Sequence, residues 1–359
     1  MTEPLRYILV GLGDMGAFWA SHTLPPAQER GLAMPVAVVD TNSSRFAIAE
    51  ESLGIRPDQC FSGIEAALAS TDCDFVIVVV PPVAHEAVAT AAIDAGKHVL
   101  CEKPIADTLE ASIRIADRAN AVGVKMAITM SHRFDQDKQT LIDRVQSGEF
   151  GRLNYLVYRC TWNRRRFGDW GEFRHRMQHP MLIEGSVHHF EIIRSLTSSD
   201  AKTVYARTWN PEWGEYAGDS TVLAIVEMEN GTRCLYEGAQ ANASTLNGWG
   251  QDYIRAECED ATLVLDRRRL SVVRSGSDGL LTTTELPLSQ ERSEWKNSAL
   301  LTDFCTWLRG GPTMATHVAD NLQCTALLFG AIQSGQTHMP VDVQDLLKSA
   351  RHDARTLTN

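Results

Sequence analysis

The chain has 359 residues, of which 44% are apolar and 22% are charged, and its formal net charge is −11. This composition is typical of a globular protein with a sizeable core, and the length favours two domains. The acidic balance argues against a general nucleic-acid binder and against a protein that sits on an anionic membrane.

The sequence predicts neither a membrane span nor a signal peptide. Its longest strongly apolar run, residues 75–80, has six residues, whereas a spanning helix needs about 20. The N-terminal residues contain no extended apolar region with a cleavage site. The eight cysteines form no Cys-x-x-Cys pair, so we expect reduced thiols and a cytoplasmic protein.

The first 130 residues alternate short apolar runs with helical stretches. The runs are rich in Val and Ile and bounded by Gly, Pro or Asp, which predicts buried parallel strands at 7–10, 36–39, 75–80, 99–101 and 126–128. Helices are predicted between them at 15–27, 44–53, 85–95 and 108–121. This β-α-β-α order indicates a doubly wound sheet with right-handed crossovers.

The pattern changes near residue 130. A helix is predicted at 134–147, followed by strands at 155–162, 203–209, 221–228, 233–239, 253–257 and 261–265. Asn230-Gly231 is a hairpin signal between two of these strands, and helices return at 295–308 and 318–334. We therefore predict an α/β protein: a Rossmann domain over 1–130, and an α+β domain with a mostly antiparallel sheet over 131–359.

A glycine motif follows the first predicted strand. Residues 11–16 read Gly-Leu-Gly-Asp-Met-Gly, a G-x-G-x-x-G pattern that opens a helix. Gly11 permits a tight turn, Gly13 lets a pyrophosphate approach, and Gly16 lets the helix pack closely on the strand. Asp40, 24 residues after Gly16, ends the next strand and can accept hydrogen bonds from ribose hydroxyls. Its carboxylate favours NAD over NADP, although the nearby Arg45 can pair with a 2′-phosphate.

A second signature lies in residues 78–104, which contain Pro81-Pro82, His85 and the run AGKHVLCEKP. With the glycine motif, this signature resembles the glucose–fructose oxidoreductase / inositol dehydrogenase / rhizopine catabolism (Gfo/Idh/MocA) family, whose most specific mark here is Glu102-Lys103-Pro104. The resemblance covers essentially the whole chain. It implies a Rossmann domain, a C-terminal domain with a large open sheet that often joins subunits, and reversible NAD(P)-dependent oxidation of a hydroxyl on a sugar, polyol or glycoside. It also implies a homodimer or homotetramer, and we expect the late helix 318–334 to pack back toward the Rossmann domain.

The same comparison suggests the catalytic groups. Lys103 ends a parallel strand, where doubly wound sheets bind ligands, and an ammonium there can stabilise an alkoxide. Residues 181–194 read as a helix in which Glu184 and His188 are four apart and share a face. A histidine suits proton removal from a hydroxyl. The family commonly places an Asp where this chain has Glu184, so Glu184 either contacts a hydroxyl or orients His188.

The segment 162–180 is the candidate for substrate specificity. It holds two Trp, two Phe, five Arg and two His in 19 residues. Aromatic faces stack on sugar rings, and Arg or His can donate to hydroxyls or anions. It reads as a sugar-binding loop, a subunit-interface arm, or, least in keeping with the acidic charge, a nucleic-acid contact. We expect substrate contacts from Arg133, Trp162, Arg164, His175 and His179.

The sequence thus predicts an NAD-dependent dehydrogenase, with NADP as the other possible cofactor. Two rival hypotheses are an oxidoreductase or redox-assisted glycosidase with tightly bound NAD, and a non-catalytic dinucleotide or sugar sensor. His175 and His179 do not fit a familiar metal-ligand pattern with Glu172, so no metal site is expected. The expected cofactor-binding residues are Gly11, Leu12, Gly13, Asp14, Met15, Gly16, Asp40, Arg45, Pro81, His85, Glu102 and Lys103.

Overall fold

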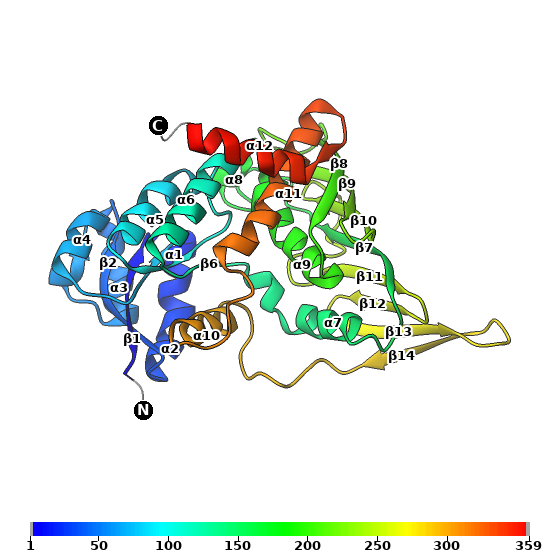
Figure 1. Ribbon diagram of the computed structural model, residues 1–359, viewed down its shortest axis with the longest axis horizontal. Coiled ribbons are helices and arrows are strands. Elements are labelled where there is room, and N and C mark those ends of the chain that lie inside the picture. Colours follow the sequence, from blue (N-terminus) through cyan, green and yellow to red (C-terminus); the bar gives the residue numbers. More distant parts are fainter. Residues whose placement is uncertain (1–2, 357–359) are drawn as a thin grey trace. The chain divides into compact units, whose positions relative to one another are not determined.

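The computed structural model describes residues 3–356 and divides into two compact units (Figure 1). Within the described residues, the first unit combines 3–130, 294–322 and 350–356, and the second combines 131–293 and 323–349. The predicted domain boundary at residue 130 places residues 294–322 and 350–356 in the second domain. In the structure, the contacts of these residues group them with the first unit. The predicted late helix is divided between the two units.

The first unit is built on a parallel sheet. Its six strands follow the order β3-β2-β1-β4-β5-β6, the order of dinucleotide-binding doubly wound folds. They are β1 (Leu5–Val10), β2 (Ala33–Val39), β3 (Cys60–Phe61), β4 (Phe75–Val78), β5 (His98–Cys101) and β6 (Met126–Ile128). The five predicted strands and the fold class are confirmed, and the two-residue β3 was too short to give a signal.

Helices connect these strands. They are α1 (Asp14–Phe18), α2 (Leu24–Glu29), α3 (Phe46–Leu53), α4 (Ile64–Ser70), α5 (His85–Asp94), α6 (Leu109–Val122) and, from the later segment, α10 (Lys296–Leu308). The prediction of one continuous helix at 15–27 was wrong, because a π-helical turn, η1 (Trp19–Thr23), separates α1 from α2. Pro25 and Pro26 have no amide hydrogen, so the regular bonding pattern cannot continue through them.

The second unit holds a nine-stranded sheet. Its order is β14-β13-β12-β11-β7-β10-β9-β8-β15. Among the described strands of this sheet, β7 and β10 pair in parallel and the other neighbours pair antiparallel. The strands are β7 (Leu153–Thr161), β8 (Ala201–Trp209), β9 (Thr221–Met228), β10 (Arg233–Ala239), β11 (Tyr253–Cys258), β12 (Thr262–Asp266), β13 (Arg269–Ser275), β14 (Leu281–Leu286) and β15 (Val341–Asp342). The mostly antiparallel sheet is confirmed, as is the Asn230-Gly231 hairpin, whose Gly231 has φ +82°.

Helices cover one face of this sheet. α7 (Gln136–Gln146) packs on β12 and β13, and α9 (Val187–Thr197) packs on β7. The π-helix η6 (Met181–Ser186) leads into α9, so the stretch predicted as one regular helix begins with a wider turn. The remaining helices are α8 (Glu172–Arg176), α11 (Val318–Thr337) and α12 (Val343–Thr356).

Two general expectations can be compared with the structure. All eight cysteines are free thiols, which confirms that they do not form a disulfide framework. Among residues 3–356, we find no helix with the length and apolar character needed to cross a membrane.

The core of the first unit includes α10. Phe304 on α10 is completely buried, and its ring meets the ring of Phe75 on β4 edge-on at a centroid distance of 5.4 Å. Phe75 in turn packs against Tyr7 on β1 at 5.6 Å. A segment more than 200 residues away in sequence thus completes the packing beneath the parallel sheet.

This packing predicts the effect of removing the Phe304 ring. Phe304→Ala should lower the free energy of unfolding by about 3–5 kcal/mol, because it leaves a cavity against β4. Urea denaturation followed by circular dichroism measures this change. The control is Leu281→Ala, at a side chain that is 73% exposed, which should change stability by less than about 0.5 kcal/mol. Equal effects of the two variants would contradict the assignment of α10 to this core.

Candidate active site

The glycine motif forms a tight junction between β1 and α1. Gly11 has φ +96°, and a Cβ there would lie 2.1 Å from the Val79 carbonyl oxygen. A Cβ on Gly16 would lie 2.0 Å from the Gly11 carbonyl oxygen. No other residue type fits at either position, so both glycines are required for the backbone to cross here.

Gly13 has a different surrounding. A Cβ on Gly13 would meet only the Arg45 guanidinium, at 3.6 Å, so the space beside its backbone is open. An open glycine at the start of a helix lets a pyrophosphate approach the free amide groups of that helix. The loop therefore fits the dinucleotide that its sequence predicts. Leu12 is buried, whereas Asp14 and Met15 are exposed on the first turn of α1.

Asp40 closes this loop from the end of β2. One carboxylate oxygen accepts a hydrogen bond from the Leu12 amide at 2.7 Å, and the other accepts from the Asn42 amide at 2.8 Å. Each oxygen keeps a second lone pair that can accept from a ribose hydroxyl. Arg45 lies 3.7 Å from the same carboxylate and is half exposed. The structure thus brings Asp40 and Arg45 together beside Gly13.

The segment after β4 is held by His85. Its ring is completely buried, with Nε2 2.8 Å from the Val80 carbonyl and Nδ1 2.9 Å from the Pro104 carbonyl. Burial lowers the pKa of His85, and the carbonyl contacts partly oppose this shift. His85 therefore ties the loop after β4, where Pro81 is exposed, to the segment after β5.

Glu102 and Lys103 follow β5 directly. Glu102 is buried, and its carboxylate accepts hydrogen bonds from the Trp19 indole at 2.9 Å and from the Lys103 amide at 3.3 Å. Lys103 is half-buried and precedes a cis peptide bond to Pro104. The carboxyl ends of β1, β2, β4 and β5 thus gather the predicted cofactor residues on one edge of the sheet, where such folds bind ligands.

In the second unit, Glu184 lies on the π-helix η6 and His188 on α9. Glu184 is buried and forms an ion pair with Arg174, whose Nε lies 2.8 Å from its carboxylate. The Arg174 guanidinium also lies over the rings of Trp170 and Phe173, at 4.8 and 4.3 Å from their centroids. Glu184 therefore joins the basic, aromatic segment 162–180 to the helix that carries His188.

His188 is almost completely buried, and its surroundings are aromatic. Its ring meets the indole of Trp249 edge-on at 5.0 Å and the ring of His132 at 6.1 Å. The adjacent His189 is completely buried, and burial lowers its pKa to about 3. His189 Nδ1 lies 2.8 Å from the Tyr236 hydroxyl, which donates to the Ser186 hydroxyl at 2.7 Å.

The five predicted substrate contacts have different environments. Arg133 pairs with the buried Glu191 of α9 at 2.5 Å, and Trp162 is buried. Arg164 is exposed, with one nitrogen 2.9 Å from the Asp169 carbonyl. His175 is buried and stacks on Tyr216 at 4.0 Å, and His179 lies 3.6 Å from the Asp219 carboxylate. Of these five, Arg164 presents its side chain to solvent.

A buried charged cluster was not anticipated. His132 Nε2 and Lys138 Nζ lie 2.9 and 2.8 Å from one oxygen of Asp252, and His189 Nε2 lies 3.6 Å from the other. Burial alone would raise the pKa of Asp252, but His132 and Lys138 lower it, so it is ionised. His132 and Asp252 are 120 positions apart in sequence, and no spacing pattern connects the residues of the cluster.

His132, His189 and Asp252 have the ligand types and proximity of a metal site. The Lys138 ammonium, however, already neutralises Asp252. Burial alone lowers the pKa of Lys138, but the carboxylates of Asp252, Asp137 and Asp135 raise it above its usual range. A divalent ion would sit beside this fixed positive charge, so the residues present fit an ion pair better than a metal.

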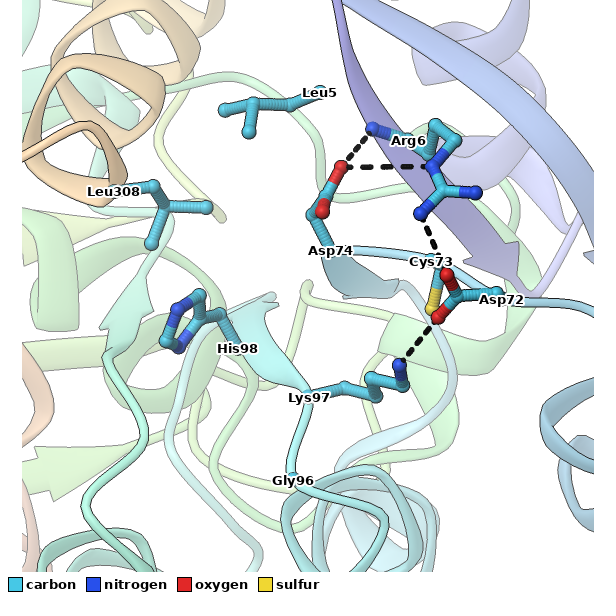
Figure 2. Close-up of a pocket in the computed structure, with 9 residues that line it drawn as sticks. All are labelled: Leu5, Arg6, Asp72, Cys73, Asp74, Gly96, Lys97, His98 and Leu308. Carbon is cyan, nitrogen blue, oxygen red and sulfur yellow. Dashed lines mark hydrogen bonds and ion pairs between the residues drawn. The ribbon is translucent and has the colours of Figure 1, made fainter.

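A pocket of about 340 Å³ opens at the amino ends of β1, β4 and β5 (Figure 2). Its charged groups are paired, because Asp72 accepts from Arg6 at 2.6 Å and from Lys97 at 2.9 Å. Burial raises the pKa of the Cys73 thiol to about 11, so it is protonated and unreactive. The pocket lies at the edge of the sheet opposite the glycine motif and shares no residue with the predicted site.

Comparison with known proteins identifies the two units. Residues 5–130 match an oxidoreductase family with an NAD-binding Rossmann fold, and residues 138–264 match the GFO/IDH/MocA C-terminal domain. The chain is 41% identical over 351 residues to protein y4oX of Sinorhizobium fredii, covering 96% of this chain and 98% of that protein. It is 31% identical over 252 residues to inositol 2-dehydrogenase of Pseudarthrobacter chlorophenolicus, covering 67% of this chain and 71% of that protein.

The fold has solved counterparts. The structure of an oxidoreductase from Agrobacterium radiobacter in complex with NAD+, L-tartaric acid and magnesium has a TM-score of 0.82 and 21% identity, covering 96% of this chain and 100% of that chain. The resemblance seen in the glycine motif and in Glu102-Lys103-Pro104 is thereby confirmed. The chain belongs to the Gfo/Idh/MocA family of oxidoreductases, and its first unit is an NAD-binding Rossmann domain.

Proposed function

We propose that the protein is an NAD-dependent dehydrogenase that oxidises a secondary hydroxyl of a sugar, cyclitol or glycoside. The observation that carries the proposal is the position of Lys103 directly after β5, on the sheet edge that holds the glycine motif and Asp40. The similarity to an inositol 2-dehydrogenase supports a polyhydroxylated ring as substrate.

The residues of the first unit have separable roles in this reaction. The amides after Gly13 bind the pyrophosphate, and Asp40 accepts from the adenosine ribose. A bound NAD would supply the acceptor for the hydride that leaves the carbinol carbon of the substrate. Lys103 donates a hydrogen bond to the substrate oxygen and stabilises the negative charge that develops on it. Glu102, held by the Trp19 indole, fixes the start of the segment that carries Lys103.

The second unit supplies the base. His188 takes the hydroxyl proton on an imidazole nitrogen, because a neutral imidazole accepts a proton readily near neutral pH. Glu184 acts as a positioning residue, since its ion pair with Arg174 holds the segment 162–180 against the helix of His188. In that segment, we assign Arg164 to the substrate hydroxyls, while Trp162, His175 and His179 shape its backbone, and Arg133 orients α9 through Glu191.

We further propose that the open face of the large sheet joins subunits into a homodimer or homotetramer. Four apolar side chains are exposed on this face, on strands that pair with one another: Tyr205, Leu223, Ile225 and Leu235. Contiguous apolar surface of this kind is typical of protein–protein interfaces.

The cofactor assignment predicts that the Asp40 carboxylate controls the preference for NADH over NADPH. The unaltered protein should bind NADH at least about tenfold more tightly than NADPH, because Asp40 repels a 2′-phosphate. Asp40→Asn should weaken NADH binding and bring the dissociation constants of NADH and NADPH closer together, as measured by fluorescence titration. Asp58→Asn, at an exposed carboxylate, should leave the ratio unchanged. Tighter binding of NADPH by the unaltered protein would contradict the assignment.

The catalytic assignment predicts a loss of turnover without a loss of cofactor. Lys103→Met and His188→Ala should each lower kcat by about 10²-fold or more, because each removes a group that acts on the reacting oxygen or its proton. The substrate is found by incubating the unaltered protein with NAD and a panel of aldoses, cyclitols, sugar acids and glycosides, and following nicotinamide reduction.

Matched controls separate catalysis from folding. Lys97→Met alters a lysine at the opposite end of the same strand, and His352→Ala alters an exposed histidine on α12. Both should keep normal turnover, and all four variants should bind NADH with the unaltered affinity. Near-normal kcat in the Lys103 and His188 variants would refute these roles. Absence of reduction with every compound would refute the dehydrogenase itself.

The proposed interface predicts the effect of a buried charge. Ile225→Asp places a carboxylate in the centre of the exposed apolar face, and burying it in an interface would be costly. We therefore expect this variant to be monomeric by sedimentation velocity, while the unaltered protein and Leu280→Asp form a dimer or tetramer. An unchanged oligomer in the Ile225 variant would show that this face does not join subunits.

A further inference from the structure

The proposed base has an exposed tryptophan as its neighbour. Trp249 lies in the segment 240–252 between β10 and β11, and 42% of its surface is exposed. Three histidine rings nevertheless contact it. His132 stacks on it at 4.3 Å with an angle of 28°, His188 meets it edge-on at 5.0 Å, and His189 lies at 5.9 Å. An exposed indole thus borders the proposed catalytic imidazole.

The turn that carries this indole is anchored on both sides. The Asn247 carbonyl accepts from the Thr161 amide at 2.8 Å, and the Asn247 side chain donates to Asp266 at 2.9 Å. The Gln251 amide donates to the Gly248 carbonyl at 2.8 Å and closes the turn. Trp249 is therefore presented by a fixed backbone.

The indole itself is fixed through His132. His132 is buried, and its Nε2 binds Asp252, three residues beyond Trp249. Asp252 also pairs with the completely buried Lys138 at 2.8 Å. The ion pair therefore secures both the His132 ring that stacks on the indole and the chain segment from which the indole projects.

This arrangement is costly if it serves stability alone. Burying ionised Asp252 and Lys138 removes both from water, and apolar residues of similar volume commonly give equal or greater stability. Such an ion pair can instead fix one arrangement of the groups that it binds. The ring so fixed is the exposed indole beside His188.

We propose that Trp249 is a substrate-contacting residue, on whose indole the carbon face of a sugar or cyclitol ring lies beside His188, and that His132 is the positioning residue that orients it. The inference rests on the proposed dehydrogenase function. The C–H groups of such a ring form an apolar face that packs well on an indole, while its hydroxyls point outward. The contact exists before and during hydride transfer, so it acts on KM more than on kcat.

The first experiment compares tryptophan variants with the panel compound that the unaltered protein oxidises most efficiently. Trp249→Ala should raise KM about tenfold or more and change kcat little, and Trp249→Phe should restore part of the affinity. The NADH dissociation constant should not change. The control is Trp209→Phe on β8, whose tryptophan has nearly the same exposure, 40%, and this variant should keep the unaltered KM.

The second experiment tests the positioning role of His132. His132→Gln keeps an N–H group at the reach of Nε2 for Asp252 but removes the ring that stacks on the indole. This substitution should raise KM when Trp249 is present and should cause no further rise in KM when it is combined with Trp249→Ala. A purely structural role of His132 would instead give independent, additive effects in the two backgrounds.

The outcomes separate this inference from the function on which it rests. If the unaltered protein oxidises a panel compound but Trp249→Ala keeps KM within twofold, the substrate contact is refuted and the dehydrogenase stands. If His132→Gln raises KM equally in both backgrounds, the positioning role is refuted. If no panel compound is oxidised, the proposed function and the inference fail together.

Discussion

The close approach of three backbone segments at Gly11, Gly16 and Val79 is the constraint on which the cofactor site depends. With a Cβ at either glycine, this crossing could not form, because the added atom would overlap a carbonyl oxygen. The crossing brings the start of α1 against the ends of β1 and β4. It leaves Gly13 open at the helix start, next to Asp40. Steric necessity at two glycines therefore creates the space and the donors for a pyrophosphate.

The second unit uses a different physical device. Beside its sheet and helix α9 lies a cluster of polar groups that are almost fully buried, and most of them bind one another. The Lys138 ammonium pairs with Asp252 and His132 binds the same carboxylate oxygen, while His189 contacts the Tyr236 hydroxyl, which donates to Ser186. Because unpaired buried charges are very costly, this network admits few alternative arrangements. The aromatic groups around His188 are thus held in one geometry.

The sequence carried enough information for the first unit and less for the second. Val- and Ile-rich runs, the glycine motif and Glu102-Lys103-Pro104 predict the parallel sheet, its ligand-binding edge and the family. The missed β13 follows Arg267 and Arg268, which adopt positive φ without a glycine, and β14 is polar and exposed, so neither gave a strand signal. Contacts between distant residues were also invisible: Arg174 with Glu184, and His132 with Asp252. Such pairs depend on the folded topology and on no local spacing.

The central claim is transfer of a hydride from a secondary carbinol carbon to the nicotinamide. The most direct measurement uses substrates deuterated at every ring carbon, chosen from the sugars and cyclitols that the protein oxidises, with mass spectrometry of the reduced cofactor. The account predicts that the reduced nicotinamide gains one deuterium, and that its formation is slower than with the unlabelled compound. Reduced cofactor without deuterium, or no reduction with any sugar or cyclitol, would contradict it.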